Sequence, residues 1–136
     1  NPLVGHMCGS RLYFASAYSG EGWISPRPPN VSAREKWVPA LEVSFREFRT
    51  KISGTPDEWL DRRVEMIDTD ATLPGWRVLL MMMEHDIHHR SQIDTYAGIN
   101  GWDVPDIYNR SAETIGGLQV QQRAKHGLAG EGNPLV

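Results

Sequence analysis

The sequence contains a single cysteine, Cys8, and no long hydrophobic run. One cysteine excludes an intramolecular disulfide and a Cys-x-x-Cys zinc or redox site, so we expect a reducing, cytoplasmic compartment. The main apolar run, residues 78–83, is far shorter than the roughly 18 to 20 residues that span a bilayer. The N-terminus lacks the basic segment that begins a secretory signal. We therefore expect neither a membrane helix nor a membrane partner.

The chain also lacks an excess of positive charge. It carries 14 Lys and Arg against 17 Asp and Glu, for a formal net charge of −3. Binding to a phosphate backbone depends on clustered basic residues, so we do not expect a nucleic-acid partner. With 136 residues, 40% of them hydrophobic, the chain can form one globular core.

The spacing of apolar residues predicts helices and no convincing strand alternation. Three prolines within residues 25–30 make that segment a crossing loop, and residues 63–72 are expected to be an extended connector. The fold class is therefore all-α, and the expected architecture is a helical bundle. The expected helices cover residues 3–18, 32–52, 73–99 and 112–125, with a short helical turn near residues 57–60.

Three of the five histidines fall within five positions. On a helix, His85 and His89 project from the same face, and their nitrogens can meet at one point about 2 Å from each. His88 is rotated roughly 100° from His89 and is expected to pair with Glu84 on the solvent side. The spacing indicates a divalent-metal site, although two partly buried polar side chains would show the same pattern.

His6 offers a third ligand if the helices at residues 3–18 and 73–99 are neighbours. With His85 and His89 it would give three neutral nitrogens and leave a coordination position open. The alternative is an ordinary core histidine. Cys8 lies roughly 200° around the same helix from His6, so we interpret it as a small buried hydrophobe and not as a ligand.

The stretch Met83–Ile93, followed by Pro105-Asp106-Ile107-Tyr108, resembles the His-rich motif and following turn of the DinB-like (damage-inducible, YfiT-like) superfamily of four-helix bundles. Residues 1–18, with His6 in a Leu-Val-Gly-His-Met context, resemble the helix that carries that family's first metal histidine. The resemblance covers about residues 1–110. It implies an up-down-down-up bundle, a divalent metal on His6, His85 and His89, and a homodimer.

The chain departs from the family pattern in two places. Ser91 stands where the family has glycine, a change that a helix tolerates. The family also has a helix ahead of its first histidine helix, for which this sequence has no residues. We expect residues 1–110 to form the bundle domain. Residues 111–136, a helix with a Gly-rich tail, are expected to complete it in the same chain or in a partner subunit.

The resemblance implies a metal-dependent enzyme, a thiol S-transferase or a hydrolase, that activates a thiol or water toward a small-molecule substrate. Zinc or nickel is the first expected ion and iron or manganese the next, with a low-molecular-weight thiol as a candidate second cofactor. Gln92, Tyr96 and Tyr18 are candidate substrate contacts, and no general base stands out. Two alternatives stay open: a non-catalytic, metal-stabilised or stress-linked small-molecule binding module, and a bundle whose histidines bind nothing.

Overall fold

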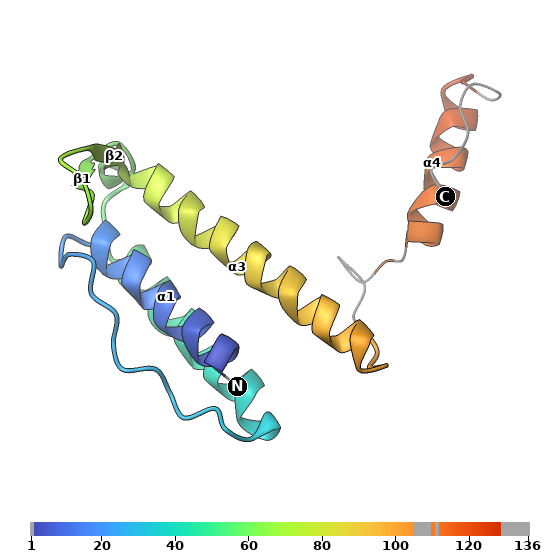
Figure 1. Ribbon diagram of the computed structural model, residues 1–136. Coiled ribbons are helices and arrows are strands. Elements are labelled where there is room, and N and C mark those ends of the chain that lie inside the picture. Colours follow the sequence, from blue (N-terminus) through green and yellow to red (C-terminus); the bar gives the residue numbers. More distant parts are fainter. Residues whose placement is uncertain (1, 105–109, 111, 129–136) are drawn as a thin grey trace. The chain divides into compact units, whose positions relative to one another are not determined.

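The computed structural model describes residues 2–104, 110 and 112–128 (Figure 1). The chain divides into two compact units, residues 1–93 and residues 94–136, and each is described by itself. The first unit holds α1 (Pro2–Tyr18), the 3-10 turns η1 (Arg34–Lys36) and η2 (Asp57–Leu60), α2 (Trp37–Ser53), the strands β1 (Arg63–Glu65) and β2 (Thr72–Pro74), and most of α3 (Gly75–Ile99). The second holds the end of α3 and α4 (Ala112–Lys125).

The observed helices confirm the predicted helical class, and most of their ends lie close to those expected from the sequence. The start of α2 differs: it begins at Trp37, about five residues later than expected, and the residues before it form the separate 3-10 turn η1. The prediction that no strand forms was wrong. β1 and β2 pair antiparallel, with Val64 opposite Leu73 and Val64 buried. Each strand has three residues, too few for a period of two to show in the sequence. The turn predicted at residues 105–108 lies outside the described residues.

The core of the first unit is built around α1. This helix carries apolar or small residues on most of its circumference, and a helix of that kind is stable only when other elements cover it. Phe48 of α2 and Val78 and Met82 of α3 pack around Phe14 and Tyr18 of α1. A second cluster contains Cys8, which is 2% exposed, so its interpretation as a buried hydrophobe is confirmed.

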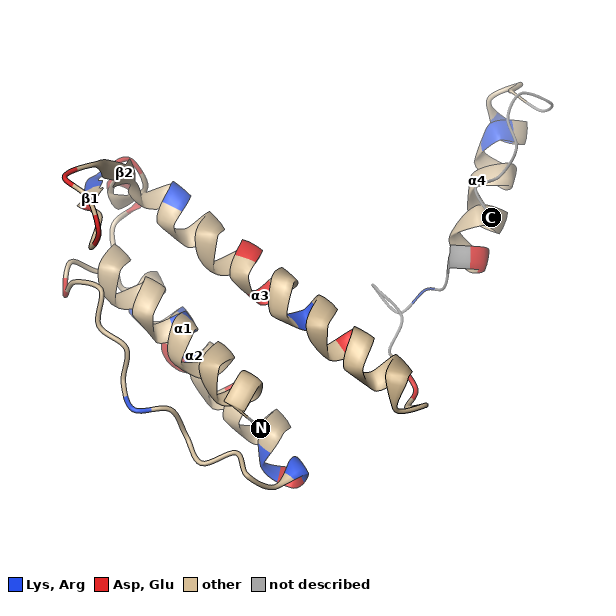
Figure 2. Cartoon of the chain, in the orientation of Figure 1, with Lys and Arg blue, Asp and Glu red and all other residues tan. Residues whose placement is uncertain are grey.

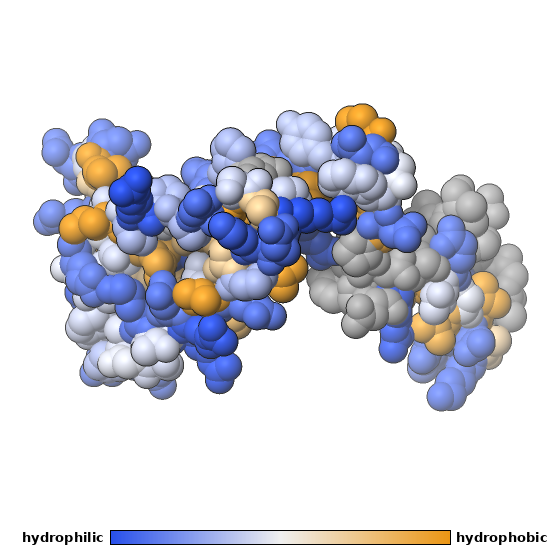
Figure 3. Space-filling model, turned by 90° about the horizontal axis from the view of Figure 1, so that it is seen from below, coloured by the Kyte–Doolittle hydropathy of each residue, from blue (hydrophilic) through white to orange (hydrophobic). Residues whose placement is uncertain are grey.

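The outer face of α3 is apolar as well. Trp76, Leu80, Met83 and Ile87 recur at intervals of four, three and four residues, and all four are exposed. Figure 3 shows on one face of the molecule that apolar side chains, in orange, reach the surface between polar ones. Apolar periodicity along α3 thus marks two faces, of which the one carrying Val78 and Met82 is buried.

A half-buried ion pair ties α3 to α1 and α2. Arg11, the one charged residue within α1 (Figure 2), donates from Nε to Asp86 Oδ2 of α3 at 2.9 Å. Its Nη1 donates to Leu41 O at 2.8 Å and to Ser44 Oγ at 3.1 Å, both on α2. The Arg11 and Asp86 side chains are 13% and 25% exposed. One rigid guanidinium therefore sets the positions of three helices.

We expect Arg11→Met to lower the free energy of unfolding by about 2 kcal/mol, because it leaves the half-buried Asp86 carboxylate without its cation. Arg77→Met is the matched control. Its ion pair with Glu84 spans 2.9 Å but is more exposed, and such pairs contribute about 1 kcal/mol or less. Urea unfolding followed by circular dichroism measures both variants. Equal losses would contradict the role of Arg11.

Candidate metal centre

Three histidine side chains from two helices meet in the first unit. His6 comes from the first turns of α1, and His85 and His89 lie one turn apart on α3. His85 Nε2 lies 3.0 Å from His6 Nε2 and 3.1 Å from His89 Nε2. The three candidate ligand atoms all lie within 4.8 Å of one another. The structure thus confirms the predicted cluster, with His6 exposed and the other two half-buried.

The hydrogen bonds of His89 fix which of its nitrogens carries a proton. Its Nδ1 lies 2.8 Å from Gln92 Oε1, an acceptor, so Nδ1–H donates there. The Gln92 amide donates in turn to His88 Nε2 at 3.2 Å, which satisfies both ends of that side chain. In neutral His89 the remaining lone pair is then on Nε2, which faces His85.

Burial disfavours charge on two of the three histidines. Burial and then the neighbouring charges of His89 and His6 lower the pKa of His85 to about 4. Burial, followed by the charge of His89, also lowers the pKa of His6. Both imidazoles are therefore neutral at pH 7, which is the form that binds metals.

The donor set fits a divalent cation. A metal about 2.0 to 2.1 Å from two nitrogens places those nitrogens about 2.8 to 3.4 Å apart at ligand angles between 90° and 109°. Both Nε2 separations of His85 fall in this interval, and all three ligand atoms lie within 4.8 Å of one another. Nitrogens at these separations share either a proton, as in a hydrogen bond, or a cation. Binding at Nε2 would also leave the proton of His85 on Nδ1, which is buried and has no hydrogen-bond partner among the described residues.

The other polar residues of this stretch of α3 have different partners from those predicted. His88 is exposed and accepts from Gln92, while Glu84 pairs with Arg77. The predicted pair of His88 and Glu84 was therefore wrong. Arg77 lies two turns before Glu84 on the same face of α3, so its long side chain can extend to the Glu84 carboxylate.

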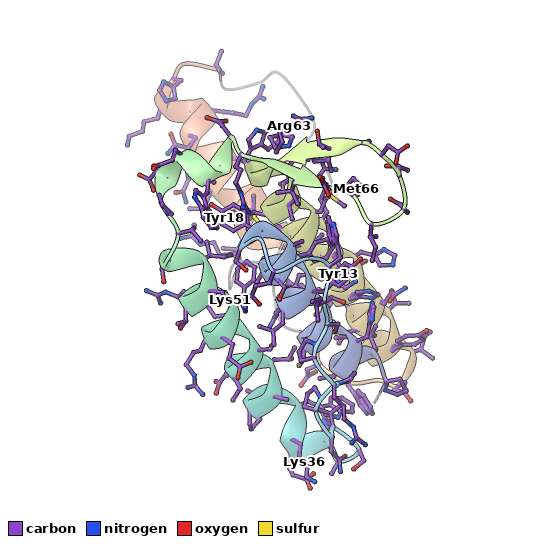
Figure 4. All side chains as sticks on the ribbon, turned by 90° about the vertical axis from the view of Figure 1, so that its left-hand side faces the viewer. Tyr13, Tyr18, Lys36, Lys51, Arg63 and Met66 are labelled. Carbon is purple, nitrogen blue, oxygen red and sulfur yellow. The ribbon has the colours of Figure 1, made fainter. Side chains whose placement is uncertain are left out.

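The three candidate substrate contacts lie in different surroundings. Gln92 touches the cluster through His89. Tyr18 is 2% exposed in the core, where its hydroxyl lies 3.3 Å from Thr55 Oγ1 (Figure 4). Tyr96 belongs to the second unit and is 58% exposed. A substrate contact stays a prediction for each of them.

The sequence analysis missed a cavity of about 310 Å³ beside the cluster, with His6 and His85 in its wall. Tyr13 and Phe14 of α1 also line it, as do residues of the loop that follows α1. Burial, and then the charge of Asp68, raises the pKa of Tyr13, so its phenol is protonated at pH 7. One signal was available: Tyr13 lies seven residues after His6, which places both on one helical face.

No described helix is long and apolar enough to cross a membrane. No curated protein and no solved structure matches the chain. The family model of the DinB family matches residues 2–123, which include both histidine-bearing helices. Because this match covers most of the 136 residues, the chain belongs to the DinB family.

Proposed function

We propose that the protein is a metal-dependent enzyme, of the thiol S-transferase or hydrolase type, in which His6, His85 and His89 hold a divalent ion. The observation that carries this proposal is the convergence of three Nε2 atoms from two helices. Three histidine ligands are typical of catalytic zinc sites, which keep a position open for water or substrate. Imidazole nitrogens suit zinc, nickel and iron, and we expect zinc or nickel first.

The chain's own residues would bind and orient the reactants. Gln92 holds the His89 ring so that Nε2 faces the cluster, as acceptors behind metal-binding histidines commonly do. The cavity beside His6 and His85 gives a small molecule access to that side of the cluster. A divalent ion in such a site lowers the pKa of bound water from 15.7 to about 7, and it also favours the thiolate form of a thiol.

Metal content of untagged protein tests the ligand set. We expect one divalent ion per chain in the wild type, and at least a 100-fold weaker affinity in His6→Ala, His85→Ala and His89→Ala, because each change leaves two ligands. His88→Ala is the matched control and should retain the ion. Elemental analysis and calorimetric titration measure both quantities. A full complement of metal in His6→Ala would remove that residue from the site. Turnover is then assayed with small thiols and electrophiles.

Gln92 provides a separate test of how the site is oriented. Gln92→Ala removes the acceptor for His89 Nδ1–H and should weaken metal binding about 10-fold or more. Gln92→Glu keeps an acceptor oxygen and should restore most of the affinity. Equal affinity in Gln92→Ala and the wild type would show that this hydrogen bond does not contribute.

The metal-free protein should lose stability as the pH falls from about 6.5 to about 4. The pKa of His85 in the folded chain, about 4, lies below the ordinary histidine pKa of 6.5. Between these values the unfolded chain binds more protons, so protonation favours unfolding. The contribution is complete above pH 6.5 and is lost toward pH 4. Urea unfolding at pH 7 and pH 5 should show a smaller loss in His85→Gln than in the wild type, and equal losses would contradict the assignment.

A further inference from the structure

We propose that the cavity beside the histidine cluster binds the uncharged, apolar body of a small molecule, a single ring or a short branched chain, whose donor atom faces His6 and His85. The inference deepens the proposed function, since it specifies the class of substrate for the same site. The cavity itself is a feature of the metal-free chain and can be tested there.

The inner wall of the cavity is mostly aromatic. The Phe14 ring lies edge-on to the His85 ring, with centroids 5.8 Å apart. Tyr13 continues this wall and packs against Trp23, which lies outside the lining, with centroids 5.1 Å apart; Figure 4 shows Tyr13 among the side chains around α1. Trp23 is fixed by a hydrogen bond from Nε1 to Glu65 O at 2.6 Å. Such a wall favours a flat or branched apolar group, because aromatic contacts add to the effect of apolar burial.

The outer wall is the loop that follows α1, and Gly9 lets it lie close to that helix. A Cβ at Gly9 would lie 3.0 Å from Ser25 Oγ, whereas one at Gly5 would make an ordinary contact, 3.4 Å from Val31 Cγ2. Ser25 Oγ also donates to Gly9 O at 3.3 Å. Prolines on either side of Arg27 restrict the backbone of this segment. The cavity is therefore held open between two walls of restricted geometry.

The lining selects against charge. Among the described residues that line the cavity there is no Lys, Arg, Asp or Glu. In the metal-free chain, a charged group placed there would lose hydration without gaining a partner of opposite sign, which is costly. The two histidines stand on one side, so a donor atom on an otherwise apolar molecule would face them.

The volume limits the size of the molecule. About 310 Å³ is at the lower end of the range for small-molecule sites, roughly 300 to 1,000 Å³. An apolar cavity of about 150 Å³ already accommodates benzene. One ring with a short substituent therefore fits, and a peptide-sized thiol would extend beyond the cavity.

Benzyl alcohol and benzoate, which differ in charge at a similar size, test the selectivity on the metal-free full chain. We expect benzyl alcohol to shift the backbone amide signals of Gly9, Ser10 and Ser25 in heteronuclear NMR titrations. Benzoate should bind at least about tenfold more weakly. Absence of shifts at these amides, or equal affinity for the two probes, would overturn the proposal.

A matched pair of variants locates the binding site. Ser25→Asp places a carboxylate in the cavity wall and should weaken benzyl alcohol binding at least about tenfold. Ser32→Asp makes the same change at another exposed serine of this loop, outside the cavity lining, and should bind as the wild type does. The amide spectrum of each variant reports its folding. A folded Ser25→Asp protein with unchanged affinity would overturn the proposal.

Zinc titration of the same proteins separates this inference from the proposed function. We expect zinc to bind the wild type and Ser25→Asp with equal stoichiometry, because Ser25 is not one of the three histidine ligands. Failure of zinc to bind, with benzyl alcohol still in the cavity, would overturn the metal-dependent function and leave the apolar subsite standing. Zinc binding without any benzyl alcohol binding would overturn the apolar subsite and leave the metal-dependent function standing.

Discussion

The ion pair between Arg11 and Asp86 fixes the register of α3 against α1, and the histidine cluster depends on that register. Arg11 follows His6 by five residues, about 7.5 Å along α1, and Asp86 is adjacent to His85. A shift of α3 by one turn would move its histidines about 5.4 Å and separate them from His6. Apolar contacts are not directional, and α3 has apolar residues on two faces, so apolar packing alone does not specify how α3 is placed. A directional, half-buried ion pair does.

The arrangement that this register produces is unfavourable for folding taken alone. Burial and then the neighbouring histidines disfavour the charged form of His85. The buried His85 Nδ1 and Asp86 Oδ1 have no hydrogen-bond partner among the described residues, which adds a desolvation cost. Unfavourable local arrangements of this kind are common at functional sites, where the residues serve the chemistry and not the stability of the fold. A cation bound by the three histidines would add favourable contacts at this site.

The sequence predicted the structural features that depend on a single helix, and it missed those that depend on contacts between separate segments. The four-residue spacing of His85 and His89 identifies a shared face without further information. His6 required the added condition that two helices are neighbours, which the family resemblance supplied. The sequence could not tell the buried face of α3 from its exposed one, because Val78 and Leu80 are equally apolar and yet differ completely in exposure. The β1–β2 pair was missed because three-residue strands carry too little pattern.

A glycine of α1 explains why the loop after it belongs to the site. Glycine inside a helix costs roughly 1 kcal/mol relative to alanine, so Gly5 and Gly9 weaken α1 as an isolated helix. In the folded chain Gly9 lets the proline-containing loop lie against the helix, because a methyl group there would press on Ser25 Oγ, whereas at Gly5 a methyl group would make ordinary contacts. The loop then closes one side of a cavity whose other side holds His6 and His85. Helix propensity is thus reduced at Gly9, where close approach of the loop shapes the space in front of the histidines.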